Sequence, residues 1–216
     1  MFNLLALDTT DIVVSVSVIA IVILFLVAFT IASKKVVFDT KKLTVISLAI
    51  ALTTTLSFLK FQLSFGGSIT VFSLVPVIIV SYYYGIFYGL FTGFITGLLQ
   101  FITSPWILTP LTFLLDYVFA FSAICLVGIF KNTFKNKTLS LTLGTTTFYL
   151  VRFIMHLLSG IIYFNSGSVV EGLPTQNAFI YSLIYNAIYI LPDMIIALAF
   201  LIPFSTRKIF KDNLLF

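Results

Sequence analysis

The chain has 216 residues, of which 60% are hydrophobic and only 9% are charged, and its formal net charge is +5. Soluble domains normally carry about 25% charged residues, so the composition excludes a soluble protein and predicts an all-α integral membrane protein in a lipid bilayer. The single cysteine, Cys125, excludes an internal disulfide and a cysteine-based metal site. The basic residues gather near the ends of apolar segments, which is typical of membrane topology and argues against nucleic-acid binding.

Seven apolar segments are predicted to cross the membrane as helices, because each approaches the roughly 20 residues that a span requires. The first, Ile12–Ala32, is preceded by Asp8 and Asp11 and followed by Lys34 and Lys35. A cleavable signal peptide carries its basic residues before the apolar run, so we expect a retained anchor helix. The other six segments are Leu43–Leu59, Thr70–Tyr84, Ile86–Ile102, Leu111–Phe130, Thr138–Phe164 and Ala178–Phe204.

Alternating these seven helices across the membrane gathers ten of the twelve basic residues on one side. Lys60 falls on the other side, and Arg152 lies within a span. The positive-inside rule identifies the basic side as cytoplasmic, so the N-terminus is predicted outside and the C-terminus inside the cell. The predicted regions are an anchor helix with a basic linker (1–42), a six-helix membrane domain (43–204) and a basic cytoplasmic tail (205–216).

Two stripes of small residues are predicted on helix surfaces, where such residues permit the close approach of another helix. Four glycines recur at every fourth residue, and we interpret them as packing positions within the chain; they are Gly85, Gly89, Gly93 and Gly97. A second stripe has the same spacing and meets either a partner protein or a neighbouring helix of the chain. It consists of Ser47, Ala51 and Thr55.

Three polar side chains on three different helices are predicted at similar depth in the outer half of the membrane. His156, the only histidine, lies eight residues before the outer end of its span, hence about 12 Å deep at 1.5 Å per residue. Asn186 lies eight residues after the outer start of its span, and Asp116 lies five residues into its own, at about 8 Å. Polar groups at such depth are costly and usually face a cavity or one another, so we predict a pocket open to the outside.

The residues around these positions favour a flat, positively charged ligand. Arg152, His156 and Gly160 share one helix face, where Gly160 would admit a ligand or a neighbouring backbone. Asn186 lies beside a stripe of tyrosines, and Phe164 lies at the rim, where a ring could be stacked. Aromatic walls around one acid attract a planar cation through cation–π interactions. The tyrosines of the stripe are Tyr181, Tyr185 and Tyr189.

Simpler interpretations of the same residues stay open. Asp116 could pair with Arg152 or His156 only to neutralise a buried charge, and His156 could be a packing residue. The tyrosines could belong to an interfacial aromatic belt, although two of them lie too deep for that to be the whole account.

Two further positions have no predicted part in the ligand contacts. Asp193 follows Pro192 near the middle of the last span, so we expect a local helix break there, with water or a partner satisfying the carboxylate. Trp106 lies in the outer loop TSPWILTP and is interpreted as an interface anchor, with a cap over the pocket as the alternative.

Five segments together form a distinctive set. They are GGSITVFSLVP (66–76), YYYGIFYGLFTGFITGLLQ (82–100), LLDYVFAF (114–121), VRFIMHLLSGIIYF (151–164) and YSLIYNAIYILP (181–192). Their order and spacing resemble the thiamine-specific substrate-binding (S) component of energy-coupling factor transporters. The resemblance implies a six-helix core, to which this chain adds an amino-terminal helix. It also implies capture of thiamine from outside and docking on a transmembrane coupling subunit driven by two cytoplasmic ATPases.

The resemblance further implies roles for individual residues. Asp116 would bind the aminopyrimidine ring, together with Tyr181 and Asn186. His156 would lie near the thiazolium ring, and Phe164 would stack on the ligand. The stripe Ser47, Ala51 and Thr55 would contact the coupling subunit.

We therefore expect a thiamine-capturing S component with no catalytic activity, no metal and no cofactor. The expected ligand residues are Asp116, Arg152, His156, Gly160, Phe164, Tyr181, Tyr185 and Asn186. One alternative is an S component for another small planar vitamin or a pyrimidine precursor. Another is a proton-coupled secondary carrier with Asp116, Arg152 and His156 as its relay. An intramembrane enzyme using His156 as a base lacks a supporting serine or metal constellation.

Overall fold

The computed structural model describes residues 9–35, 37, 39–63, 67–106, 109–165, 177–207 and 210. Its longer helices are α1 (Thr9–Lys35), α2 (Thr40–Leu56), α3 (Val75–Tyr84), α4 (Ile86–Thr103), α8 (Lys137–Asn165) and α9 (Ala178–Ser205). Between α4 and α8, short helical segments follow one another: α5 (Pro110–Phe113), η1 (Leu114–Phe119), α6 (Ala120–Ser122), α7 (Cys125–Ile129) and η2 (Phe130–Asn132). The helical membrane fold that the composition predicts is thereby confirmed.

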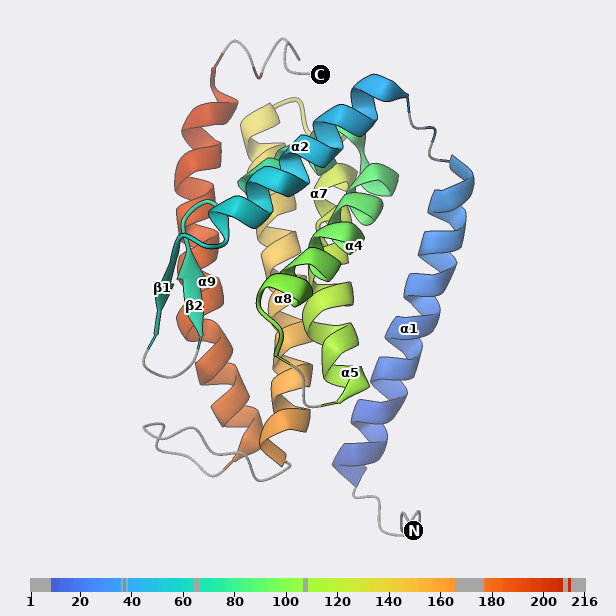
Figure 1. Cartoon of the computed structure of the whole chain (residues 1–216), viewed down its shortest axis with the longest axis vertical. Helices are drawn as coiled ribbons and strands as arrows, with labels where there is room; N and C mark the ends of the chain where they lie inside the picture. Colours follow the sequence, from blue (N-terminus) through green and yellow to red (C-terminus); the bar gives the residue numbers. More distant parts are fainter. Residues whose placement is uncertain are drawn as a thin grey trace.

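Four stretches of the described residues are long and apolar enough to cross a membrane. They are Ile86–Thr103, Pro110–Asn132, Lys137–Phe164 and Ala178–Ser205. Helix α3 has only 10 residues, which rise about 15 Å, or half of a bilayer core of about 30 Å. The predicted span Thr70–Tyr84 is therefore wrong as a complete helical crossing, because its first residues end a strand and then turn. Helix α2 runs obliquely across its neighbours (Figure 1).

A short antiparallel hairpin, β1 (Lys60–Gln62) and β2 (Ser68–Thr70), connects α2 to α3 and is the feature that the predicted helices omit. Its register pairs Lys60 with Thr70 and Gln62 with Ser68. Figure 1 shows the hairpin beside α9 at the edge of the bundle. Strands of three residues are too short to show a convincing alternation of polar and apolar residues. The Gly66–Gly67 dipeptide between them is the sequence signal that could have indicated a hairpin.

The glycine stripe of α4 packs against the helical run that follows it in the chain. A Cβ atom at Gly93 would collide with the backbone of Phe121 and Ser122, and one at Gly97 would collide with the backbone carbonyl of Tyr117. Only glycine lets the two helices approach this closely. The predicted packing role is confirmed for Gly89, Gly93 and Gly97, and their close contacts hold the helical run that carries Asp116. Gly85 instead lies between α3 and α4 with a φ of 91°, and a Cβ atom there would meet nothing within 4 Å.

The second small-residue stripe lies on the outer face of α2. Ser47, Ala51 and Thr55 are all exposed, and so are Leu48 and Leu52 beside them. The opposite face of α2 is buried through Ile46, Ala49, Ile50 and Thr53. Within the described chain this stripe therefore faces away from the bundle, which leaves it accessible to a partner or to lipid.

The basic helix ends gather at one end of the molecule. Figure 1 shows the end of α1, the start of α2 and the end of α9 near that end, whereas the start of α1 lies near the opposite one. Lys34, Lys42 and Arg207 belong to these helix ends. Part of the predicted basic tail, including Lys208 and Lys211, lies outside the described residues.

Candidate functional site

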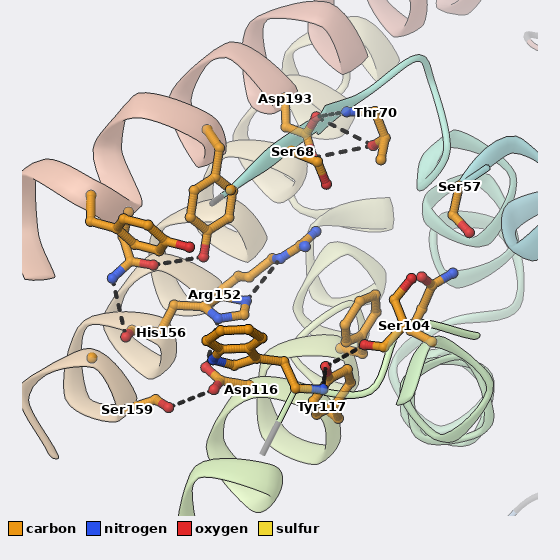
Figure 2. Close-up of a pocket in the computed structure, with 18 of the residues that line it drawn as sticks. Ser57, Ser68, Thr70, Ser104, Asp116, Tyr117, Arg152, His156, Ser159 and Asp193 are labelled. Carbon is orange, nitrogen blue, oxygen red and sulfur yellow. Dashed lines mark hydrogen bonds and ion pairs between the residues drawn. The ribbon is translucent and has the colours of Figure 1, made fainter. Parts of the chain in front are cut away.

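A cavity of about 780 Å³ lies among α4, η1, α8, α9 and the hairpin. Its volume falls within the roughly 300–1,000 Å³ of typical small-molecule sites. Seven of the eight predicted ligand residues line it: Asp116, Arg152, His156, Gly160, Phe164, Tyr185 and Asn186. The hairpin contributes lining residues from both strands, so it forms part of the cavity wall (Figure 2). We call the two strands, Lys60–Gln62 and Ser68–Thr70, the β cap.

The polar centre of the cavity is a hydrogen-bonded chain that joins η1 to α8. His156 Nδ1 lies 2.7 Å from Asp116 Oδ1, and the Ser159 hydroxyl donates to Asp116 Oδ2 at 2.5 Å (Figure 2). Arg152 Nε donates to His156 Nε2 at 3.4 Å. An ionised carboxylate only accepts, so in that state the contact requires the proton on His156 Nδ1, and Nε2 accepts from Arg152. The predicted convergence of the acid and the imidazole is confirmed, and the pairing of Asp116 is with His156 rather than with Arg152.

Asp116 keeps capacity for a ligand despite this pairing. A carboxylate offers about four lone-pair sites, and the contacts with His156 and Ser159 occupy two of them. The Asp116 side chain is 18% exposed and lines the cavity. Charge neutralisation and ligand binding are therefore compatible roles of the same carboxylate.

Asp116 is carried by a π-helical segment, which is a second feature that sequence periodicity does not indicate. The segment η1 has six residues, and the Ala120 N–H donates to the Leu115 carbonyl five residues earlier. π-helical turns are rare, and they are frequent at functional sites. The wider turn sets the direction in which Asp116 leaves the helix.

Asn186 ties α9 to α8 just behind His156. Its Nδ2 donates to the His156 carbonyl at 3.2 Å and to the Ser182 carbonyl at 2.9 Å, and its Oδ1 accepts from the Tyr189 hydroxyl at 2.6 Å. Asn186 is only 3% exposed. Both amide hydrogens are thus used within the protein, and the second lone pair of Oδ1 is what remains for a ligand.

Aromatic rings form one side of the cavity. The ring centroids of Phe164 and Tyr185 lie 6.0 Å apart, and those of Tyr185 and Tyr189 lie 5.7 Å apart. Trp106 also lines the cavity, its ring centroid 6.0 Å from that of Tyr163. Its backbone N–H donates to the Tyr117 hydroxyl at 2.9 Å. Trp106 is also 65% exposed, so its position fits both the interface anchor and the capping alternative.

Two predicted ligand residues have different surroundings from those expected. Tyr181 is not among the cavity-lining residues; it is 3% exposed and packs on Phe164, with the ring centroids 4.1 Å apart. A Cβ atom at Gly160 would collide with the Ser182 side chain, whose hydroxyl donates to the Leu157 carbonyl. Gly160 thus makes room for helix α9 while it also lines the cavity, and Tyr181 packs behind the aromatic side of the cavity.

Asp193 belongs to the cavity, contrary to the expectation that it lies outside the site. Helix α9 continues through Pro192 without the predicted break, and Asp193 is 6% exposed. Its Oδ1 accepts the backbone N–H of Thr70 at 2.7 Å, and the Thr70 hydroxyl lies 3.3 Å from both carboxylate oxygens (Figure 2). The carboxylate is satisfied by the hairpin, so Asp193 fastens strand β2 to α9.

We expect Asp193→Ala to loosen the β cap. The substitution leaves the Thr70 N–H without its acceptor, and an unpaired buried donor costs about 1–3 kcal/mol. Ligand dissociation should become faster, by roughly tenfold for each 1.4 kcal/mol by which the attachment of β2 to α9 is weakened. Hydrogen exchange at the Thr70 amide and the dissociation rate would measure both effects.

Asp193→Asn is the matched control for that variant. It keeps an acceptor oxygen for the Thr70 N–H and should retain slow dissociation. Equal dissociation rates in wild type and Asp193→Ala would show that this bond does not hold the cap.

The fold and the cavity together define a class: a helical membrane protein with a cavity of small-molecule size, lined by aromatic rings and a β-hairpin. Residues 43–211 match the sequence profile of the family described as thiamine transporter protein. The chain therefore belongs to this thiamine transporter family, and it is a multi-pass membrane transporter rather than an enzyme.

Two individual proteins resemble the chain. The thiamine transporter ThiT of Bacillus subtilis (strain 168) is 31% identical over 141 residues, which are 61% of this chain and 71% of that protein. The structure of ThiT from Listeria monocytogenes superposes with a TM-score of 0.63 at 20% identity, covering 79% of this chain and 93% of that one. This structural similarity supports the assignment of the fold. Helix α1 precedes the residues that the family profile matches.

Proposed function

We propose that the chain captures thiamine from outside the cell as the S component of an energy-coupling factor importer. Membership of the thiamine transporter family supports the vitamin, and the cavity supports the binding chemistry. The observation that carries the proposal is the junction of Asp116, His156 and Asn186, from three helical segments, within one aromatic-lined cavity.

The chemistry of thiamine matches the groups that the cavity offers. Its aminopyrimidine ring carries N–H donors, which suit the free lone pairs of Asp116 and the Asn186 oxygen. Its thiazolium ring is a flat cation, which suits the rings of Phe164 and Tyr185 and the edge of the Trp106 cap. The guanidinium of Arg152 lies 4.8 Å from the Phe121 ring centroid, so that ring partly balances its charge. We infer that the thiazolium lies on the side of the aromatic wall, away from Arg152.

The coupling partner in this proposal is a transmembrane subunit driven by two cytoplasmic ATPases. The chain itself contains no phosphate-binding loop, so energy must come from elsewhere in an ATP-driven importer. The exposed stripe Ser47, Ala51 and Thr55 on α2 supplies the docking face in the proposal, because small side chains allow another helix close backbone approach.

The proposed orientation follows from the basic helix ends. Lys34, Lys42 and Arg207 would face the cytoplasm, with the start of α1 outside. The cavity would then open toward the outer half of the membrane, where a captured vitamin would arrive. Labelling of single cysteines at Thr206 and Asn177 by a membrane-impermeant maleimide in intact cells would test this, in a Cys125→Ser background. We expect labelling at Asn177 only.

Binding by the purified protein alone tests the ligand. We expect tight binding of thiamine, weaker binding of its isolated pyrimidine half and none of riboflavin, measured by titration and competition. Tighter binding of the pyrimidine half than of thiamine would instead support the precursor as the substrate.

A proton-coupled carrier is the second candidate, and the hydrogen-bonded chain Arg152–His156–Asp116 is the observation that favours it. The two functions differ in their energy source. Uptake by vesicles that hold this protein alone, driven by a proton gradient, would support the carrier. We expect no uptake until the coupling subunit and the ATPases are added with ATP.

A further inference from the structure

Helix α1 packs on the transporter core through aromatic side chains, although it precedes the residues that match the family. The ring centroid of Phe25 lies 5.2 Å from that of Phe119 and 6.1 Å from that of Phe94. One turn later, the ring centroid of Phe29 lies 4.8 Å from that of Phe91. Figure 1 shows α1 alongside the bundle, next to the start of the helical run that carries Asp116. Helix α1 thus docks on the bundle through defined side-chain contacts.

The residues that α1 covers form the back of the ligand site. Ile21, Val22 and Phe25 pack against a buried cluster formed by Leu115, Val118 and Phe119 of η1. Leu115 precedes Asp116 in the chain. From α8, the same cluster is joined by Met155 and Leu158, which precede His156 and Ser159, the two partners of Asp116. Asp116, His156 and Ser159 therefore each follow a residue that belongs to the cluster on which α1 packs.

The segment that α1 covers has a conformation that needs support. Residues Leu114–Phe119 are π-helical, and such turns occur as isolated bulges because the α-helix is ordinarily preferred. A return to α-helical winding would shift the register by one residue, which rotates a side chain by about 100°. Asp116 would then turn away from His156 and Ser159. Packing on the apolar face of the segment opposes that change.

We propose that α1 is a built-in positioning helix, in which Phe25 packs on Phe119 to hold the π-helical segment and thereby keep Asp116 directed into the ligand cavity. This inference rests on the proposed function, because it assigns α1 a part in ligand affinity. Phe25 touches no ligand in this account; it acts through Phe119 and Leu115 on the acid.

The test compares four variants of the full chain by thiamine titration and thermal unfolding. Phe25→Ala should weaken thiamine binding about tenfold, and Phe25→Leu, which refills most of the space, should restore most of the affinity. Leu24→Ala is the matched control, because Leu24 is 70% exposed on the outer face of α1; its affinity should equal that of wild type. Asp116→Ala provides the background for the decisive comparison.

Combining Phe25→Ala with Asp116→Ala distinguishes positioning of the acid from general destabilisation. If α1 acts through Asp116, Phe25→Ala should cause no further loss of affinity once the carboxylate is absent. An equal loss in both backgrounds, or an unchanged affinity in Phe25→Ala alone, would overturn the proposal.

A ligand-independent measurement separates this proposal from the proposed function. In a Cys125→Ser background, cysteines at positions 25 and 119 should be joined by a short bifunctional reagent, whether or not thiamine is present. Absence of that cross-link would overturn the docking of α1. Unchanged thiamine binding in Asp116→Ala would instead refute the proposed ligand site while leaving the docked helix in place.

Discussion

Asp116→Ala is expected to lower the affinity for thiamine by at least ~100-fold. The carboxylate would accept N–H donors of the aminopyrimidine in a site shielded from water, and a buried charged hydrogen-bond partner can be worth roughly 3 kcal/mol. Each 1.4 kcal/mol corresponds to a factor of ten in the dissociation constant. The same substitution leaves His156 Nδ1 and the Ser159 hydroxyl without their acceptor, so a lower unfolding temperature should accompany the loss.

A control substitution at another acid makes that result interpretable. Asp39→Asn removes an acid that caps α2, far from the cavity and 56% exposed, and asparagine also caps helices well. Its thiamine affinity should equal that of wild type. Titration of the purified variants, with folding checked by thermal unfolding, measures the difference. A folded Asp116→Ala protein with wild-type affinity would remove Asp116 from the site.

Ala51→Trp is expected to lower coupled uptake by about tenfold or more without changing thiamine binding. Ala51 lies in the middle of the exposed stripe on α2, where the proposed coupling subunit approaches. An indole there would block close backbone contact, and overpacking a close interface typically costs about 1–3 kcal/mol, hence a loss on the order of tenfold or more in assembly. Uptake in cells that supply the coupling subunit and the ATPases, measured beside binding by the purified variant, separates the two effects.

The matched control for this substitution is Ala20→Trp. Ala20 is also an exposed alanine on an apolar helix, but it lies on α1. We expect normal uptake from Ala20→Trp. The reverse pattern, with uptake lost in Ala20→Trp and kept in Ala51→Trp, would place the coupling interface on α1 and contradict the proposed docking face.

The meeting of polar residues from different helices could be predicted from the sequence. The rise per residue placed Asp116, His156 and Asn186 at similar depth, and the cost of isolated polar groups in lipid predicted that they meet. The structure joins Asp116 to His156 directly and Asn186 to the His156 carbonyl. This prediction needs only the position of each residue along its helix and the polarity of its side chain, and both can be read from the sequence.

The direction in which each side chain points could not be predicted in the same way. Tyr181 and Tyr185 share a helix face by spacing, yet only Tyr185 lines the cavity, because Phe164 lies against Tyr181. Gly160 faces Ser182 because α8 and α9 pack closely. The rotation of one helix relative to another depends on all the contacts between them. The spacing of residues within a single helix does not predict it.

Departures from regular α-helix could not be predicted from the sequence either. The π-helical winding around Asp116 leaves no mark in the apolar pattern, and strands β1 and β2 are too short to produce one. Asp193 was expected to need water or a partner, but its carboxylate accepts the backbone N–H of Thr70. The sequence did not reveal this contact, because the two residues lie 123 positions apart in the chain. Local irregularities supported by distant contacts are what single-sequence reasoning lacks, and here they shape the cap and the acid of the site.

A structure of the protein with thiamine bound tests the central claim most directly. We predict that the vitamin occupies the cavity between Asp116 and the Phe164 wall, with an aminopyrimidine nitrogen about 2.7–2.9 Å from an Asp116 carboxylate oxygen. Thiamine bound elsewhere, or in this cavity with its pyrimidine out of hydrogen-bonding reach of Asp116, would contradict the account.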